Sequence, residues 1–384
     1  MNKEQIKNKK ILRTSTVATS LETFCKDMLR ELNKQYEVVA VSSDDDDLRL
    51  IEQREGVRVI PVNMKRQISP LTDLKCLWKL YRIFRKEKPE MVHSITPKAG
   101  LLSMMAAWMA RVPVRVHTFT GLVFPTAKGL KRRILILTDK LTCACATTIY
   151  PEGHGVKNDL ERYNITRKPL KVLGYGNVRG IDRDYYARTE EVLISARDIR
   201  DDSLFTFIFV GRLVGDKGIN ELLWAFDEIS KTNEKVRLIL VGREEPELDP
   251  LTDISKSILS TNKRILAVGQ QNDVRPWMAA ADAFVFPSYR EGFPNVVLEA
   301  GALDLPAIVT DINGSNEIII EGKNGTIITP RDRHALKTKM VNWLENPDMV
   351  SKMAAEAREM IISRYERHIV WRALFDEYAK LIDK

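Results

Sequence analysis

The stretch that decides the fold is Ala283-Phe-Val-Phe286, followed by a short loop and then by Pro294-Asn-Val-Val-Leu-Glu299. Four apolar residues bounded by Pro287 are typical of a buried strand. Pro294 suits the first position of a helix, because the N–H group that proline lacks would have no partner there. A strand that passes through a short loop into a helix is the repeating unit of a parallel α/β sheet.

The same stretch combines two carboxylates with a site for an anion. The first N–H groups of the expected helix, those of Asn295 and Val296, would attract a phosphate-sized anion. Glu299 lies one turn later on the same helix face, and Glu291 stands in the loop before the helix. A nucleotide-sugar carries hydroxyl groups on both sides of a diphosphate, so this arrangement predicts a nucleotide-sugar site.

Strand-like and helix-like segments alternate along almost the whole chain, which indicates parallel sheets with crossover helices. A glycine-rich stretch, 174–185, interrupts this rhythm and predicts a linker. We therefore expect an α/β protein of two Rossmann-like, doubly wound domains facing a cleft, with ligands at the carboxyl ends of the strands. The expected divisions are 1–173, the linker 174–185, 186–366, and a C-terminal helix, 367–384, packing back toward the first domain.

The apolar patterns also set the expected elements. The expected strands are Ile11–Arg13, Val38–Val41, Val57–Val62, Met91–Ile95, Val114–Phe119 and Ala144–Ile149, then Phe205–Val210, Arg237–Val241, Ile265–Val268, Ala283–Phe286, Ala307–Val309 and Gly325–Ile328. The expected helices include Leu21–Leu32 with Thr19 or Ser20 as N-cap, Asp73–Lys88, Ala99–Ala110, Lys131–Leu141, one from about Ile219, Pro347–Tyr365 and His368–Ile382.

Length and composition fit a two-domain globular protein: 384 residues, 44% of them hydrophobic and 29% charged. The longest apolar run, Ala99–Ala110, falls short of the roughly 18 residues that a membrane span needs. The N-terminal residues show no apolar core of a signal peptide. The four cysteines lack paired spacing, which indicates reduced thiols in a cytoplasmic protein. Cys143-x-Cys145 has no histidine nearby, so we expect no zinc there.

The charge is distributed unevenly between the two halves. Residues 1–180 carry 33 Lys and Arg against 18 Asp and Glu, whereas the rest of the chain carries 27 against 34. A basic first half suits nucleic acid, an anionic membrane surface or a phosphate-bearing acceptor. The helices expected at Asp73–Lys88 and Lys128–Lys140 are basic and amphipathic, as in proteins that rest on anionic lipid. The alternative is an ordinary core face with a solvated face.

A second candidate loop is Val210-Gly211-Arg212-Leu-Val-Gly-Asp-Lys217-Gly218, which follows one expected strand and precedes a helix. Glycines let a ligand approach the backbone, and two cations five residues apart could clamp a diphosphate. Cations in such loops are often merely solvated. Together with Glu291 and Glu299 at the end of another strand, however, they predict one shared site.

Several other patterns give weaker evidence for a functional site. Gly174-x-Gly176-x-x-x-Gly180 has the wrong spacing for a dinucleotide fingerprint and predicts a turn. Asp44–Asp47 and Asp182-Arg-Asp184 contain the D-x-D pattern of some metal-binding transferases, but neither has clear metal partners, so both are expected to be solvated charge. His93 and His117 fall near strand ends, close to the expected cleft.

With these motifs in place, the chain resembles the retaining glycosyltransferases of family 4, which have the GT-B fold. Glu291 and Glu299 match the family's E-x7-E signature, and Arg212 with Lys217 match its G-R-x4-K-G element. Val92–Gly100 and Val112–Gly121 resemble first-domain segments of bacterial members that build capsule or O-antigen polysaccharides.

The resemblance implies a role for each matched residue. Arg212 and Lys217 would neutralise the donor diphosphate and stabilise the leaving group without a metal or another cofactor. Glu299 would bind the ribose, and Glu291 with the turn that follows it would hold the donor sugar. The further donor contacts expected in this domain are Gly211, Gly269 and Gln270, the last two near the base, and Gly292, Phe293, Pro294 and Asn295 in the turn.

Two features depart from the family pattern. Many members carry a histidine that contacts the donor sugar just before the glycine that ends the fifth strand, whereas here Thr120 precedes Gly121. Thr120 and Gly121 are still expected to contact the substrate at this position. The first loop, Ser15–Ser20, also lacks the usual glycines.

The expected function is that of a hexosyltransferase at the cytoplasmic face of the membrane. It would move a sugar from a UDP- or GDP-sugar to a lipid-linked glycan, contact anionic membrane peripherally, and bind no nucleic acid. The alternatives are a nucleotide-sugar 2-epimerase and an inactive nucleotide-sugar-binding subunit.

Overall fold

The computed structural model describes residues 9–383 apart from 66, 68, 246 and 248. The chain divides into two compact units: the first unit comprises 1–180 and 368–384, and the second unit comprises 181–367. The division falls at Gly180, inside the stretch expected to be a linker, and that glycine has φ +70°.

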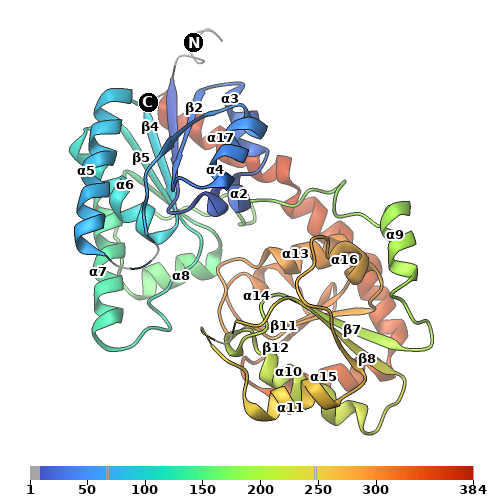
Figure 1. The fold of residues 1–384 in the computed structure, drawn as a ribbon. Helices are drawn as coiled ribbons and strands as arrows, with labels where there is room; N and C mark the ends of the chain where they lie inside the picture. The colour runs from blue at the N-terminus through green and yellow to red at the C-terminus, as the bar shows by residue number, and fades with distance from the viewer. Residues whose placement is uncertain (1–8, 66, 68, 246, 248, 384) are drawn as a thin grey trace. The chain divides into compact units, whose positions relative to one another are not determined.

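The first unit is built on a six-stranded parallel sheet in the order β3-β2-β1-β4-β5-β6 (Figure 1). This is the Rossmann order, in which the chain reverses direction across the sheet between the two central strands, here β1 and β4. The strands are β1 (Lys10–Thr14), β2 (Glu37–Ser42), β3 (Arg58–Pro61), β4 (Met91–Ile95), β5 (Val114–Phe119) and β6 (Thr148–Pro151).

Alternation along the strands supplies two cores, one on each face of this sheet. Ile11 packs in one core and its neighbour Leu12 in the other. The first core is covered by α2 (Ala18–Cys25), α3 (Met28–Asn33), α4 (Asp46–Glu55) and the C-terminal α17 (Arg367–Ile382). The second is covered by α5 (Pro70–Glu87), α6 (Pro97–Met109), α7 (Gly129–Cys145) and α8 (His154–Arg162).

The second unit repeats the same topology, with the order β12-β11-β10-β7-β8-β9. The strands are β7 (Phe205–Val210), β8 (Val236–Val241), β9 (Ile265–Ala267), β10 (Ala283–Phe286), β11 (Ala307–Thr310) and β12 (Gly325–Ile328). The helices are α9 (Glu190–Arg197), the 3-10 turn η1 (Gly215–Lys217), α10 (Ile219–Ser230), α11 (Asp253–Thr261), α12 (Arg275–Ala279), α13 (Asn295–Ala302), α14 (Ser315–Ile318), α15 (Arg333–Glu345) and α16 (Pro347–Tyr365).

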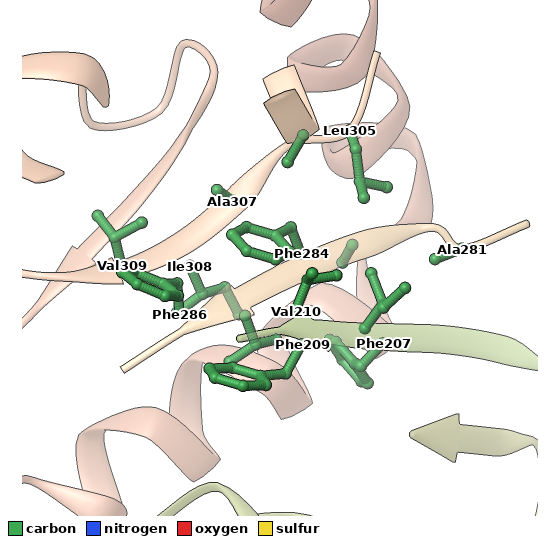
Figure 2. Close-up of a cluster of buried hydrophobic side chains, with 14 of the residues drawn as sticks. Phe207, Phe209, Val210, Ala281, Phe284, Phe286, Leu305, Ala307, Ile308 and Val309 are labelled. Carbon is green, nitrogen blue, oxygen red and sulfur yellow. The ribbon is translucent and has the colours of Figure 1, made fainter. Parts of the chain in front are cut away.

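Aromatic side chains fill the centre of the second unit. Phe209 on β7 and Phe286 on β10 stack with ring centroids 5.9 Å apart, and Phe284 stacks on Phe286 at 5.8 Å (Figure 2). All three are buried. These rings support the two central strands at the ends from which the site loops leave.

The first helical region differs from its prediction. The helix expected over Leu21–Leu32 is two helices, and Val17 rather than Thr19 or Ser20 precedes the first of them. The chain breaks at Asp27, which has φ +62°. Buried Glu55 accepts hydrogen bonds from the N–H groups of Asp27 at 2.9 Å and Arg30 at 3.0 Å, so a carboxylate from α4 caps the second helix.

Asp44, Asp46 and Asp184 are exposed, as expected of solvated charge, but two other residues of these acidic patterns have structural roles. Asp45 is the N-cap of α4, and its carboxylate accepts the N–H of Leu48 at 3.1 Å. Asp182 accepts the N–H groups of Asp184 and Tyr185 and pairs with Arg367 at 2.7 Å. Short polar side chains satisfy nearby N–H groups in this way at helix starts and turns.

The sixth strand and several helices also differ from the prediction. The sixth strand begins at Thr148 rather than Ala144, because α7 continues to Cys145. The helices α4, α8, α9, α11, α12, α14 and α15 had no counterpart among the predicted elements.

Candidate active site

The candidate site lies in the second unit, at the carboxyl ends of the central strands β7 and β10. The loop after β7 leads into η1, and the loop after β10 leads into α13. The N–H of Tyr289 donates to the carbonyl of Asp216 at 2.8 Å, which joins the two loops. Gly218 permits their close approach, because a Cβ there would lie 2.1 Å from the carbonyl oxygen of Pro287.

This junction brings Lys217 and Glu291 together. The ammonium of Lys217 donates to Oε1 of Glu291, and each side chain is only 16% exposed. The ammonium also lies 5.3 Å from the ring centroid of Phe286, so the aromatic core supports the cation. Oε1 accepts a second hydrogen bond, from the hydroxyl of Ser288 at 2.7 Å.

Arg212 lies on the neighbouring part of the same edge. Its guanidinium donates to Glu245 at 3.0 Å, and this hydrogen bond holds the pKa of the Glu245 carboxyl below its usual range. Arg212 lines an open hollow of about 340 Å³ together with Gly211 and Gln270. Among the residues proposed from sequence, these three therefore share one hollow.

Glycines shape that hollow. Gly242, at the end of β8, donates its N–H to the carbonyl of Gly269 at 2.8 Å. A Cβ on Gly242 would lie 1.8 Å from the carbonyl oxygen of Gly211, so only glycine fits. Gly269 itself has φ +68°, a conformation that favours glycine.

The E-x7-E stretch has a more buried second carboxylate than expected. Glu299 is 9% exposed and accepts a hydrogen bond from the hydroxyl of Tyr186 at 2.8 Å. Pro294 is the N-cap of α13 rather than its first residue, because its ψ of 103° is extended. Phe293 is buried, and the α13 helix begins at Asn295. The turn that starts with Gly292 therefore anchors the helix through an aromatic side chain.

Four residues of the first unit were singled out from the sequence: Thr120, Gly121, His93 and His117. Thr120 and Gly121 follow β5, both half-buried, and Gly121 has φ +129°. His93 and His117 are each 1% exposed, and His93 lines a small cavity of the first unit together with Thr118 and Tyr150. His93 contacts Arg13, Tyr378 and Thr118.

His117 accepts or donates one hydrogen bond with Ser94 at 2.8 Å. Burial lowers the pKa of His117 to about 3, and it holds the pKa of His93 well below its usual value. Both rings are therefore neutral near pH 7.

The described part of the chain contains no group of three or more His, Cys, Asp or Glu side chains arranged to hold a metal ion. None of its helices combines the length and apolar character required to cross a bilayer.

Comparison with known proteins identifies the family. The model described as "Glycosyl transferases group 1" matches residues 194–360, and "Glycosyl transferase 4-like domain" matches residues 20–176. The capsular polysaccharide biosynthesis glycosyltransferase CapM of Staphylococcus aureus is 31% identical over 374 residues, 97% of each chain. The chain belongs to the group 1 glycosyltransferases.

Another relative and two solved structures are also glycosyltransferases or resemble this chain in fold. The UDP-Gal:alpha-D-GlcNAc-diphosphoundecaprenol alpha-1,3-galactosyltransferase of Escherichia coli is 28% identical over 309 residues, 78% of each chain. The structure of Anabaena HepE with UDP and glucose matches with a TM-score of 0.80 at 18% identity, covering 97% of this chain and 100% of HepE. WaaG, involved in lipopolysaccharide biosynthesis, matches with a TM-score of 0.72 at 16% identity, covering 97% and 99%. These similarities show the GT-B fold.

Sequence reasoning did not single out four residues around the candidate site: Gly242, Glu245, Ser288 and Thr310. Gly242 and Ser288 follow the apolar runs of β8 and β10, so their position at strand ends was a usable signal. Thr310 follows the predicted strand Ala307–Val309 and carried the same signal, whereas Glu245 offered none, because its importance comes from a partner 33 residues away in the chain.

Proposed function

We propose that this glycosyltransferase moves a sugar from a UDP- or GDP-sugar to a lipid-linked glycan in surface polysaccharide biosynthesis. The observation that carries the proposal is the pairing of Lys217 and Glu291 at the carboxyl ends of β7 and β10, beside the hollow of Arg212. Relatives named for capsular polysaccharide biosynthesis and for a diphosphoundecaprenol-linked acceptor support the pathway and the acceptor class.

The donor would be held by charge and by hydroxyl contacts. Lys217 and Arg212 would approach the diphosphate, and their ion pairs with Glu291 and Glu245 keep both cations in place before the donor arrives. Gly269 and Gln270 would flank the base, since the backbone there lies close to the strand ends and Gln270 lines the hollow. Glu299 would accept ribose hydroxyls, with Tyr186 orienting its carboxylate.

The proposed chemistry is front-face displacement with retention. The bond between the anomeric carbon and the diphosphate oxygen breaks, and the acceptor oxygen bonds to the same face of that carbon. The departing phosphate takes the proton of the acceptor hydroxyl. Fixed cations that meet the growing negative charge lower this barrier without a metal. The name of the Escherichia coli relative specifies alpha-1,3 transfer, which a retaining enzyme achieves from an alpha-linked donor.

The test is a panel of UDP- and GDP-sugars, scored by thermal shift and by release of the nucleoside diphosphate with membrane extract as the acceptor source. We expect one donor to stabilise the protein and to release its nucleotide only with extract, at the same rate in a chelator. Conversion of the sugar without any acceptor would indicate the 2-epimerase, and binding without release would indicate an inactive subunit. Product of inverted configuration, or loss of turnover in the chelator, would overturn the mechanism.

We further propose that the first unit rests on an anionic membrane at the cytoplasmic face through α7. Leu130, Ile134, Leu137 and Leu141 recur along one side of that helix and are 72%, 40%, 66% and 39% exposed. Exposed Lys131 and Arg133 lie beside them. An unpartnered apolar stripe flanked by cations suits a lipid surface that is apolar inside and negative at its headgroups.

A further inference from the structure

A hydrogen-bonded series of side chains links three strand ends of the second unit behind Glu291. Ser288 follows β10, Thr310 ends β11, and Lys217 ends the turn after β7. Ser288 and Thr310 are both fully buried. The hydroxyl of Thr310 donates to the carbonyl of Ser288, and the hydroxyl of Ser288 in turn donates to Glu291.

The Ser288 hydroxyl has one proton and three possible acceptors. Oε1 of Glu291 lies at 2.7 Å, whereas the carbonyl oxygens of Asp216 and Arg290 both lie at 3.4 Å. A shorter hydrogen bond to a charged acceptor is the stronger one, so the proton lies on the line to Glu291.

Both donors to Glu291 meet the same oxygen. Lys217 and Ser288 each donate to Oε1, and no described residue donates to Oε2. Since Oε1 is engaged by a buried hydroxyl on one side and a cation on the other, rotation of the carboxylate would break both hydrogen bonds. The carboxylate is therefore held with Oε2 as the oxygen that can accept a hydroxyl from a ligand.

We propose that Ser288 is a positioning residue that fixes the rotation of the Glu291 carboxylate, so that Oε2 is presented to a hydroxyl of the donor sugar. Thr310 supports it by holding the backbone of Ser288. This inference rests on the proposed function, because it takes Glu291 as the residue that receives the donor sugar.

A double-mutant cycle of Ser288→Ala and Glu291→Gln tests the proposal, with kcat and KM measured for the active donor. A lost hydrogen bond to a charged group corresponds to about a tenfold to hundredfold change, so Ser288→Ala is expected to lower kcat/KM by that factor. In the Glu291→Gln background the same substitution should cost less than about twofold, because the carboxylate that it positions is gone. The affinity for the free nucleoside diphosphate should stay unchanged.

Ser315→Ala is the matched control. Ser315 is also fully buried in the second unit, but its hydroxyl has no hydrogen-bond partner among the described residues, so its loss should leave kcat/KM unchanged. If Ser288→Ala proves unstable, Thr310→Val carries the same cycle, since it keeps the shape of the side chain and removes only the donor to Ser288.

The outcomes separate the two proposals. An equal loss from Ser288→Ala in both backgrounds, or a weakened affinity for the nucleoside diphosphate, would show a merely structural role and overturn the inference. No loss from Ser288→Ala or Thr310→Val would overturn it as well. Full activity of Glu291→Gln alone would instead overturn the role of Glu291 in the proposed donor site.

Discussion

At the scale of single residues, the candidate site works by pairing each cation with a fixed carboxylate. Lys217 pairs with Glu291 and Arg212 with Glu245, so under the proposed function both cations would already be paired before a diphosphate binds. Preorganised charge of this kind is the largest single contribution in many enzymes, because the protein need not rearrange as charge develops. Both cations should therefore matter more for turnover than for folding.

We expect Arg212→Ala and Lys217→Ala each to lower kcat by about 10²-fold or more, through lost stabilisation of the leaving diphosphate. Steady-state release of the nucleoside diphosphate measures this directly. Arg264→Ala provides the control, because Arg264 is a half-buried arginine of the same unit whose guanidinium contacts only Glu234 among the described residues, through a 3.7 Å ion pair and a 3.3 Å hydrogen bond to its carbonyl. Near-normal turnover in both site variants would contradict the diphosphate clamp.

A second residue-scale feature is the buried carboxyl of Asp139 on α7, which is 9% exposed. Desolvation raises its pKa from 3.8 to about 7. The folded protein therefore holds this proton more tightly than the unfolded chain does. Its contribution to stability is full below pH 3.8 and is lost as pH rises through 7.

Asp139→Asn is accordingly expected to stabilise the protein at pH 8, by roughly 2–4 kcal/mol, because the amide stays neutral. The gain should shrink steadily as pH falls and disappear near pH 3.5. Denaturant unfolding at several pH values measures it, with the exposed Asp253→Asn as control. A gain that is independent of pH would contradict this account.

At the scale of elements, α7 is amphipathic in an unusual sense, because one apolar side packs in the core while another apolar stripe faces outward. Cys143 and Cys145 belong to the buried side, whereas Leu130 and Leu137 are well exposed. The helix is also basic in its first turns. Exposed apolar stripes of this kind mark interaction surfaces, which is the reason for proposing a membrane contact here.

Leu130→Ser with Leu137→Ser, and separately Lys131→Glu with Arg133→Glu, should each reduce sedimentation with vesicles of anionic lipid several-fold. The first pair removes apolar area and the second reverses the attraction to headgroups. Ile254→Ser, on the exposed face of α11 in the second unit, is the matched control at 71% exposure. Unchanged sedimentation of both double variants would contradict the proposed membrane contact.

At the scale of the whole molecule, the chain returns to the first unit after building the second. Tyr378 on α17 is fully buried there, and its hydroxyl contacts Arg13 on β1 and His93 on β4. Arg13 is a buried cation whose described side-chain hydrogen-bond partners are His93, Tyr378 and Cys25, with no carboxylate among them. The C-terminal helix therefore supplies a polar contact that the sheet needs as well as apolar cover.

Tyr378→Phe should lower the free energy of unfolding by about 2 kcal/mol, because it leaves a buried charge short of a hydrogen-bond acceptor. Thermal unfolding measures the loss, and the exposed Tyr185→Phe is the control. Donor binding should be unaffected, since the second unit holds the proposed donor residues. Equal melting temperatures for the two variants would show that Arg13 is satisfied without Tyr378.

Much of the fold could be predicted because its signals are local. The strands Phe205–Val210, Ala283–Phe286 and Gly325–Ile328 and the helix Pro347–Tyr365 have the predicted limits, since an apolar run or a helical period is written in consecutive residues. The break at Asp27 escaped prediction, because it depends on a carboxylate from Glu55, two helices away.

The candidate site divides in the same way. The sequence by itself determined that glycines, cations and carboxylates follow the central strands of a parallel sheet, and the carboxyl ends of such strands gather at one edge. Only the tertiary structure decided that Lys217 and Ser288 donate to the same oxygen of Glu291. It also decided that the hydroxyl of Tyr186 donates to Glu299, and that His93 and His117 are buried. Such pairings depend on how distant segments pack, and packing depends on side-chain volumes throughout the core rather than on any local pattern.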